Sequence, residues 1–168
     1  MSTETANRHS DLSRRLIQQA NYELDQKGDR VQACEKASGA VAQAVKAIAE
    51  DRQWRHGSHN LRRTVVDLIA AEYQLPDMIL LQAVADQLHE NFYEDRFHET
   101  QLRERIQRAT ELLEQLWIIR ERGPNPSFVP DSQQQQTIER LQLSNEEAAA
   151  DPLIDFPPPL PPFEPPDS

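Results

Sequence analysis

Arginine and histidine residues gather just after the most alanine-rich stretch of the chain. Arg52 and His59 have six residues between them, and Trp54, Arg55 and His56 belong to that interval. An imidazole can move the 2′-hydroxyl proton of RNA while a guanidinium stabilises the negative charge that develops on the phosphate. Arg52 and His59 are therefore candidate catalytic residues for RNA cleavage without a metal ion.

The same residues also have a structural interpretation, which we favour. An arginine at the C-terminal end of a helix interacts favourably with the helix dipole, and Trp54 can cover the end of a helical bundle. By helical spacing, Arg52 falls on the apolar side of the preceding helix. We therefore expect Arg52, rather than Arg55, to point towards an inner cleft or a partner surface.

A second group of polar and aromatic residues occupies positions 89–94, with the sequence HENFYE. Phe92 continues an apolar helical stripe, and His89 lies beside that stripe, within reach of polar residues that border the apolar face of the alanine-rich helix. The polar cleft predicted in this way comprises Glu35, Lys36, Lys46, His89, Asn91, Tyr93 and Glu94. A buried polar network that fixes helix register is the interpretation we prefer, and a ligand site is the alternative.

Other chemistries find little support in the sequence. The four glycines are isolated, so no phosphate-binding glycine loop occurs. His56 and His59 form an H-x-x-H pair without a third ligand nearby, and we predict neither a metal site nor a cofactor. Cys34 is the only cysteine, and its alanine and valine neighbours indicate a small core residue.

The hydrophobic pattern predicts an all-α protein, an up-and-down bundle of about five helices. Its centre is the alanine-rich helix, which begins after the N-cap Asp29 and ends near Trp54. Most residues of its wide apolar face are alanine, so neighbouring helices can approach it closely. The residues of this face are Ala33, Cys34, Ala37, Ala40, Val41, Ala44, Val45, Ala47, Ile48 and Ala49.

The other helices follow from apolar spacing and from start and stop signals. One precedes Gly28, one runs from the cap Ser58 to Leu75, one follows the cap Asp77, and one spans about 99–122 before Gly123. Residues 91–98 are expected to form a structured turn. We assign the bundle to residues 11–122. We assign a flexible N-terminus to residues 1–10, because this first stretch is polar.

The chain changes character after residue 122. Eleven of its twelve prolines lie there, and eight acidic residues against one arginine give residues 123–168 a net charge of −7, out of −10 for the whole chain. Such a segment buries too little apolar surface to fold alone, so we predict a disordered, acidic, proline-rich tail with a short helix over 137–143. The tail either docks in the groove of a protein partner or simply keeps the protein soluble.

The chain contains three segments, EKASGAVAQAVKAIAEDRQW, GSHNL and LHENFYED. Their order and separations resemble those of the PaREP-type family of small prokaryotic proteins. This family is grouped with the HEPN-like helical bundles, and the resemblance covers roughly residues 12–117. It implies a dimeric bundle. Some HEPN-like proteins are toxin-type endoribonucleases with an R-x(4–6)-H motif, which only Arg52 and His59 match, although after a different helix from the usual one. Other HEPN-like proteins are catalytically silent partners of nucleotidyltransferases, and still others are nucleotide-binding modules.

These observations favour a non-enzymatic HEPN-like interaction module, expected to form a homodimer in a stress or genome-defence context. One alternative is a metal-independent endoribonuclease that uses Arg52 and His59, and RNA is a partner only in that case. The other alternative is binding of a nucleotide or small ligand in the polar cleft. The polar N-terminus and the lack of a long apolar run predict a cytoplasmic protein without a membrane partner.

Overall fold

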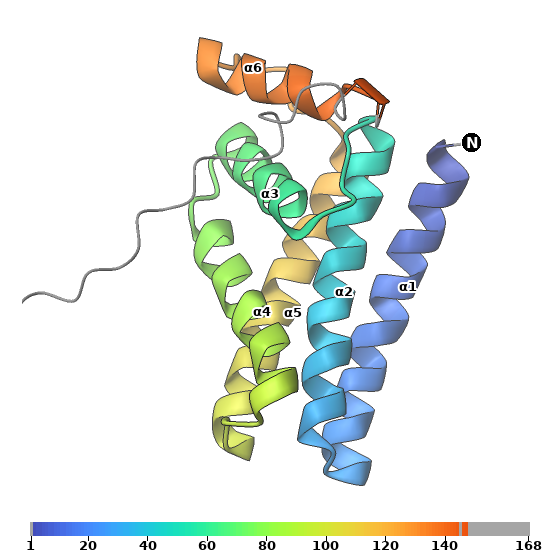
Figure 1. The fold of residues 1–168 in the computed structure, drawn as a ribbon, viewed down its shortest axis with the longest axis vertical. Coiled ribbons are helices and arrows are strands. Elements are labelled where there is room, and N and C mark those ends of the chain that lie inside the picture. The colour runs from blue at the N-terminus through green and yellow to red at the C-terminus, as the bar shows by residue number, and fades with distance from the viewer. Residues whose placement is uncertain (1, 145, 148–168) are drawn as a thin grey trace, which may run out of the picture.

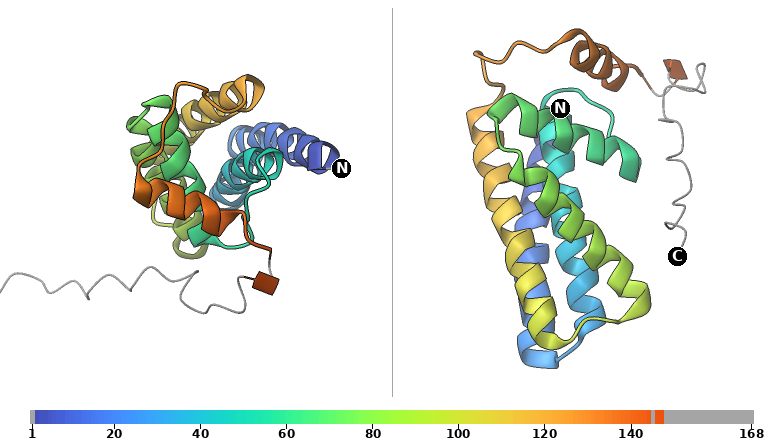
Figure 2. Two further views of the ribbon diagram at one scale, coloured as in Figure 1. Left: turned by 90° about the horizontal axis from the view of Figure 1, so that it is seen from above. Right: turned by 90° about the vertical axis from the view of Figure 1, so that its left-hand side faces the viewer.

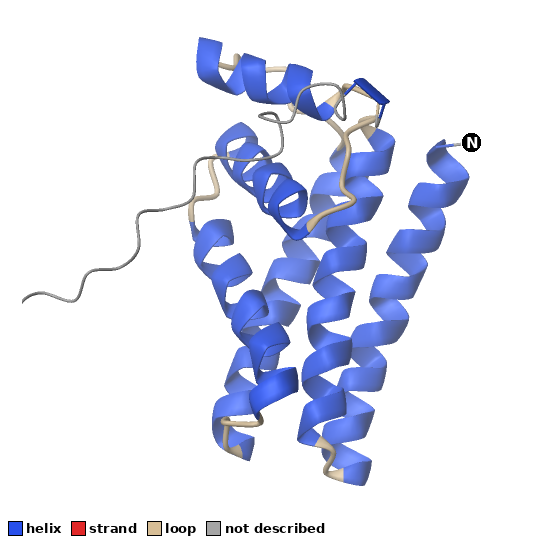
Figure 3. Ribbon diagram, in the orientation of Figure 1, coloured by secondary structure: helices blue, strands red, loops and turns tan. Residues whose placement is uncertain are grey.

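The computed structural model of the chain describes residues 2–144, 146 and 147, and the elements that it defines there are all helical (Figures 1 and 3). The prediction of an all-α protein is therefore confirmed. In chain order the elements are α1 (Ser2–Tyr22), the short π-helix η1 (Glu23–Lys27), α2 (Arg30–Asp51), α3 (His59–Tyr73), α4 (Asp77–Glu94), α5 (Glu99–Arg122) and α6 (Ser132–Leu141).

Four helices form the body of the bundle. Helices α1, α2, α4 and α5 run along its long axis, and the shorter α3 connects α2 to α4 near one end (Figures 1 and 2). Helix α2 contacts α1, α4 and α5, which makes it the central helix. No helix among the described residues is both long enough and apolar enough to cross a membrane.

The centre of the bundle is the apolar face of α2. All ten residues predicted for that face are buried, and none exposes more than 2% of its surface. Since seven of these ten side chains are alanine or cysteine, they fill little volume, and the larger core residues come from the helices around α2. The small side chains of α2 thus let three neighbouring helices approach one backbone.

Helix α1 begins earlier than the sequence suggested. Residues 2–10 are helical, whereas we expected a flexible N-terminus there. The buried side of α1 continues a regular spacing of three and four residues through Ala6, Ser10 and Ser13 to Ile17. Ser13 donates a hydrogen bond to the Ser10 carbonyl (2.6 Å) and accepts one from Trp117 Nε1 (2.9 Å). Serine therefore occupies core positions there, and a search for large apolar residues misses the pattern.

The helix starts depend on side-chain caps, as the sequence indicates. Asp29 accepts a hydrogen bond from the Gln32 amide (3.0 Å), and Ser58 accepts one from the Leu61 amide (3.1 Å). Asp77 does not cap α4; it is the first residue of that helix, after Pro76. Helix α4 also continues into the predicted turn as far as Glu94 and ends where Asp95 adopts a left-handed conformation.

The first part of the predicted tail is ordered on the bundle. Helix α6 lies across the end of the bundle at which α1 begins and α5 ends (Figure 1), with Leu141 only 2% exposed. The backbone amide of Arg55 donates to the Leu141 carbonyl (2.8 Å), and its guanidinium donates to the Arg140 carbonyl (3.0 Å). The folded unit thus continues beyond the predicted boundary at residue 122, and residues 148–168 lie outside the described part.

Candidate functional site: a polar groove between α2, α3 and α4

A groove of about 470 Å³ lies between α2, α3 and α4. It brings together three residues that the sequence analysis singled out separately, namely Glu35 of α2, His59 of α3 and His89 of α4. Several of the residues that α2 contributes to its lining are small. The other lining residues are Ser38, Gly39, Val41, Ala42, Val45, Arg62, Gln82, Ala85 and Asp86.

Asp86 organises the rim of this groove. Its carboxylate accepts hydrogen bonds from Arg63 Nη2 (2.9 Å) and Gln82 Nε2 (3.1 Å), and His59 Nε2 lies 3.3 Å away. Only 12% of the Asp86 side chain is exposed, whereas His59 and Arg63 expose about half of theirs. His59 is therefore positioned by α4, and the sequence analysis did not include Asp86 among the site residues.

Two cationic side chains, Lys46 of α2 and Arg62 of α3, interact electrostatically, and Arg62 lines the groove. Burial lowers the pKa of Arg62, and the Asp86 carboxylate offsets part of that effect. Burial also lowers the pKa of Lys46, and repulsion from the Arg62 guanidinium adds to it. Burial disfavours the charged form of both groups, and an anion bound beside them would stabilise their charges by Coulomb attraction.

Arg52 takes no part in this groove. Its Nη1 lies 2.8 Å from Oε1 and 2.7 Å from Oε2 of Glu72, and both side chains are more than 90% buried. The guanidinium also lies over the Trp54 ring, 5.0 Å from the ring centroid. Arg52 and His59, the predicted catalytic pair, are consequently held by different carboxylates, Glu72 of α3 and Asp86 of α4.

The remaining residues of the predicted polar cleft are divided among separate contacts. Lys36 donates to Glu23 (3.0 Å), and exposed Glu94 pairs with Arg96 (3.1 Å). The side chain of Tyr93 lies outside the described part of the structure.

Asn91, another residue of the predicted polar cleft, takes part in a buried hydrogen-bond network. It is 3% exposed and donates from Nδ2 to the Cys34 sulfur (3.1 Å). Its Oδ1 accepts from the amides of Arg96 (2.6 Å) and Phe97 (3.1 Å), which fixes the turn between α4 and α5. Burial raises the pKa of the Cys34 thiol, consistent with a core residue.

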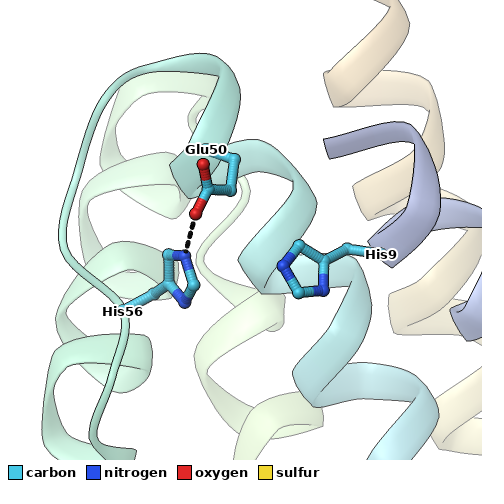
Figure 4. Close-up of side chains that lie close together, drawn as sticks. All are labelled: His9, Glu50 and His56. Carbon is cyan, nitrogen blue, oxygen red and sulfur yellow. Dashed lines mark hydrogen bonds and ion pairs between the residues drawn. The ribbon is translucent and has the colours of Figure 1, made fainter. Parts of the chain in front are cut away.

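His56 and His59 do not form a pair. His59 is the first residue of α3, whereas His56 lies in the preceding loop and turns back to Glu50 of α2, with 2.6 Å between Nε2 and Oε1. His9 of α1 approaches the same place, as Figure 4 shows, and its ring is edge-on to that of His56 at 5.7 Å between centroids. In place of the H-x-x-H pair, the structure forms a different cluster of His9, Glu50 and His56, in which His9 comes from a distant part of the sequence.

The fold and the groove define the class of the protein as an all-α bundle built around an alanine-rich central helix. Within that class the chain belongs to the archaeal PaREP1/PaREP8 family, whose family model matches residues 8–113. The match includes every residue that lines the groove and ends within α5, before α6. Comparison with the curated proteins and with the solved structures found no significant match in either set.

Proposed function

We propose that the protein is a non-enzymatic, HEPN-like interaction module that forms a homodimer through α4 and α5. The observation that supports this proposal is a group of exposed apolar side chains on these two helices. Leu80 is 69% exposed, Ile79 48% and Ile118 49%; Tyr22 of α1 (55%) is also exposed. Exposed large apolar side chains on two neighbouring helices are typical of a protein contact.

The surface between α4 and α5 also has a shape suited to a partner helix. It forms a groove of about 460 Å³ that Leu80, Leu81 and Val84 line from α4. Helical spacing places Ile118 on the same stripe of α5 as Glu111 and Gln115, which line the other wall.

The charges of that wall suit a second copy of the chain. Glu104, Arg108 and Glu111 alternate in sign along the α5 wall of this groove. In a two-fold symmetric contact the same patch meets itself, so an antiparallel α5 pair places each arginine near glutamates of the other copy. A stress or genome-defence role follows from the resemblance to HEPN-like proteins, many of which act as dimers.

Leu80→Glu is expected to convert the dimer into a monomer. The substitution puts a charge into the proposed interface, and Leu80 is too exposed to contribute much to the core of one chain. Sedimentation velocity over a range of concentrations measures the change. Val129→Glu is the matched control, because Val129 is an exposed apolar residue (84%) in the loop before α6. A monomeric parent protein, or a Leu80→Glu variant that remains dimeric, would contradict the proposal.

A second candidate function, binding of a phosphate-bearing ligand in the groove, has support from Lys46 and Arg62. Burial lowers the pKa of both groups, and repulsion from Arg62 adds to the effect at Lys46. A phosphate at this position would compensate both, and His59 and His89 lie on the same groove. Under this hypothesis the groove, rather than the α4–α5 face, is the functional surface.

Thermal melting with a panel of nucleotides, at matched ionic strength, tests this second function. We expect a bound nucleotide to raise the Tm of the parent protein and of Lys36→Met, whose lysine pairs with Glu23 away from the groove. The Tm increase should disappear in Lys46→Met and in Arg62→Met. Equal increases in all four proteins would show a general salt effect and would eliminate the groove as a phosphate site.

A further inference from the structure

Three potential metal ligands converge at the end of the bundle where α1 begins. They are His9 from α1, Glu50 from the last turn of α2 and His56 from the loop that follows (Figure 4). One ring nitrogen from each histidine and one carboxylate oxygen lie within 4.8 Å of one another. We propose that His9, Glu50 and His56 form a binding site for a divalent transition-metal ion, with Zn²⁺ as its best fit.

The ligand set selects the kind of ion. Two imidazoles and one carboxylate are the ligands of many zinc sites in which a fourth position stays open to water. Magnesium and calcium prefer sites made of oxygen ligands and would gain little from two imidazoles. Zinc–ligand bonds of about 2.0–2.2 Å place tetrahedral ligands roughly 3.4 Å apart, so modest side-chain rotations bring the three groups onto one ion.

Both imidazoles are held in a way that leaves a nitrogen lone pair. His9 Nδ1 lies 2.6 Å from Gln43 Oε1, and because an amide oxygen only accepts, Nδ1 carries the proton of the neutral ring and Nε2 keeps its lone pair. His56 donates from Nε2 to Glu50, and its Nδ1 is buried without a hydrogen-bond partner among the described residues. A carbonyl oxygen that accepts from the other ring nitrogen, as that of Gln43 does, commonly orients a metal-binding histidine.

The surroundings hold the cluster in place while leaving it accessible. Arg62 Nη1 donates to the His56 carbonyl (3.2 Å) and so fixes the loop from outside the cluster. The side chains of His56 and Glu50 are 18% and 28% exposed, which admits an ion and a water ligand. A bound ion would join the first half of α1 to the last turn of α2 and the loop that follows it.

Isothermal titration of the chelator-treated protein with ZnCl₂ tests the proposal. We expect one Zn²⁺ per chain for the parent protein, no comparable binding for His9→Ala or His56→Ala, and no comparable heat with MgCl₂. Gln43→Leu should retain the site with an affinity about 10- to 100-fold lower, since Gln43 acts through His9. A rise in Tm on addition of Zn²⁺ that the parent shows and His9→Ala lacks provides a second measurement.

The matched control is His98→Asn. It removes an imidazole elsewhere on the surface, while asparagine preserves a side-chain cap at the start of α5. This variant should bind Zn²⁺ as the parent does, and circular dichroism should show parent-like helicity for all variants without metal. Absence of Zn²⁺ binding by the parent, or binding that persists in both His9→Ala and His56→Ala, would overturn the proposal.

Discussion

Arg52→Ala is expected to lower the free energy of unfolding by about 3–5 kcal/mol. Arg52 and Glu72 form an ion pair whose side chains are 7% and 8% exposed, so removal of the guanidinium leaves the Glu72 carboxylate buried and uncompensated. The loss of contact with the Trp54 ring adds to the effect. Urea denaturation followed by circular dichroism measures the difference.

The control for this prediction removes both charges together. Arg52→Met combined with Glu72→Leu leaves no buried charge, and such replacements are often neutral or stabilising. We therefore expect the double variant to recover most of the stability that Arg52→Ala loses. If the double variant were as unstable as the single one, the ion pair would not be the cause.

The double variant also separates structure from catalysis. It is expected to fold without Arg52, so it can stand beside the parent protein and His59→Ala in an RNA cleavage assay in EDTA. Because Arg52 and His59 are bound to different carboxylates, we expect no RNA cleavage that depends on these two residues. Cleavage by the parent that both variants lack would establish the endoribonuclease alternative.

Ala40→Leu is expected to destabilise the protein by about 1–3 kcal/mol, because it forces extra volume into the packed face of α2. Ala40 is fully buried in a helix that contacts α1, α4 and α5. The same change at Ala83, an exposed position of α4, is the control and should alter stability by less than about 0.5 kcal/mol. Thermal and urea unfolding of the two variants would give the comparison.

A small effect of Ala40→Leu would carry a specific meaning. It would show that the helices around α2 can separate without much loss, and hence that close approach to the alanine face contributes little stability. The result would contradict the role we assign to that face. The burial of the alanine face would then need an explanation other than close packing.

The sequence predicted the helices well where their signals are local. The alanine face of α2 and the caps Asp29 and Ser58 depend only on residue type and spacing, and the structure confirms all of them. The first turns of α1 were missed because their buried positions are occupied by Ala6, Ser10 and Ser13. Small residues bury little apolar area, so a hydrophobic pattern does not register them.

The candidate sites were much harder to predict, because tertiary packing selects their members. His59 and His89 were singled out for separate reasons, and only the packing of α3 and α4 on α2 brings them to one groove. His9 meets His56 because α1 lies against α2, which no sequence spacing reveals. Arg52 matched a catalytic spacing, but Glu72, its partner, lies on another helix.

The contact between Arg55 and α6 links two segments that are distant in the sequence. The Arg55 amide bonds to the Leu141 carbonyl, so exchange of its hydrogen with solvent requires this bond between the loop and the end of α6 to open. Arg55 is also the neighbour of His56 in the chain. A displacement of α6 therefore also moves the loop that carries His56. Local unfolding of α6 would in this way disturb the proposed ion site.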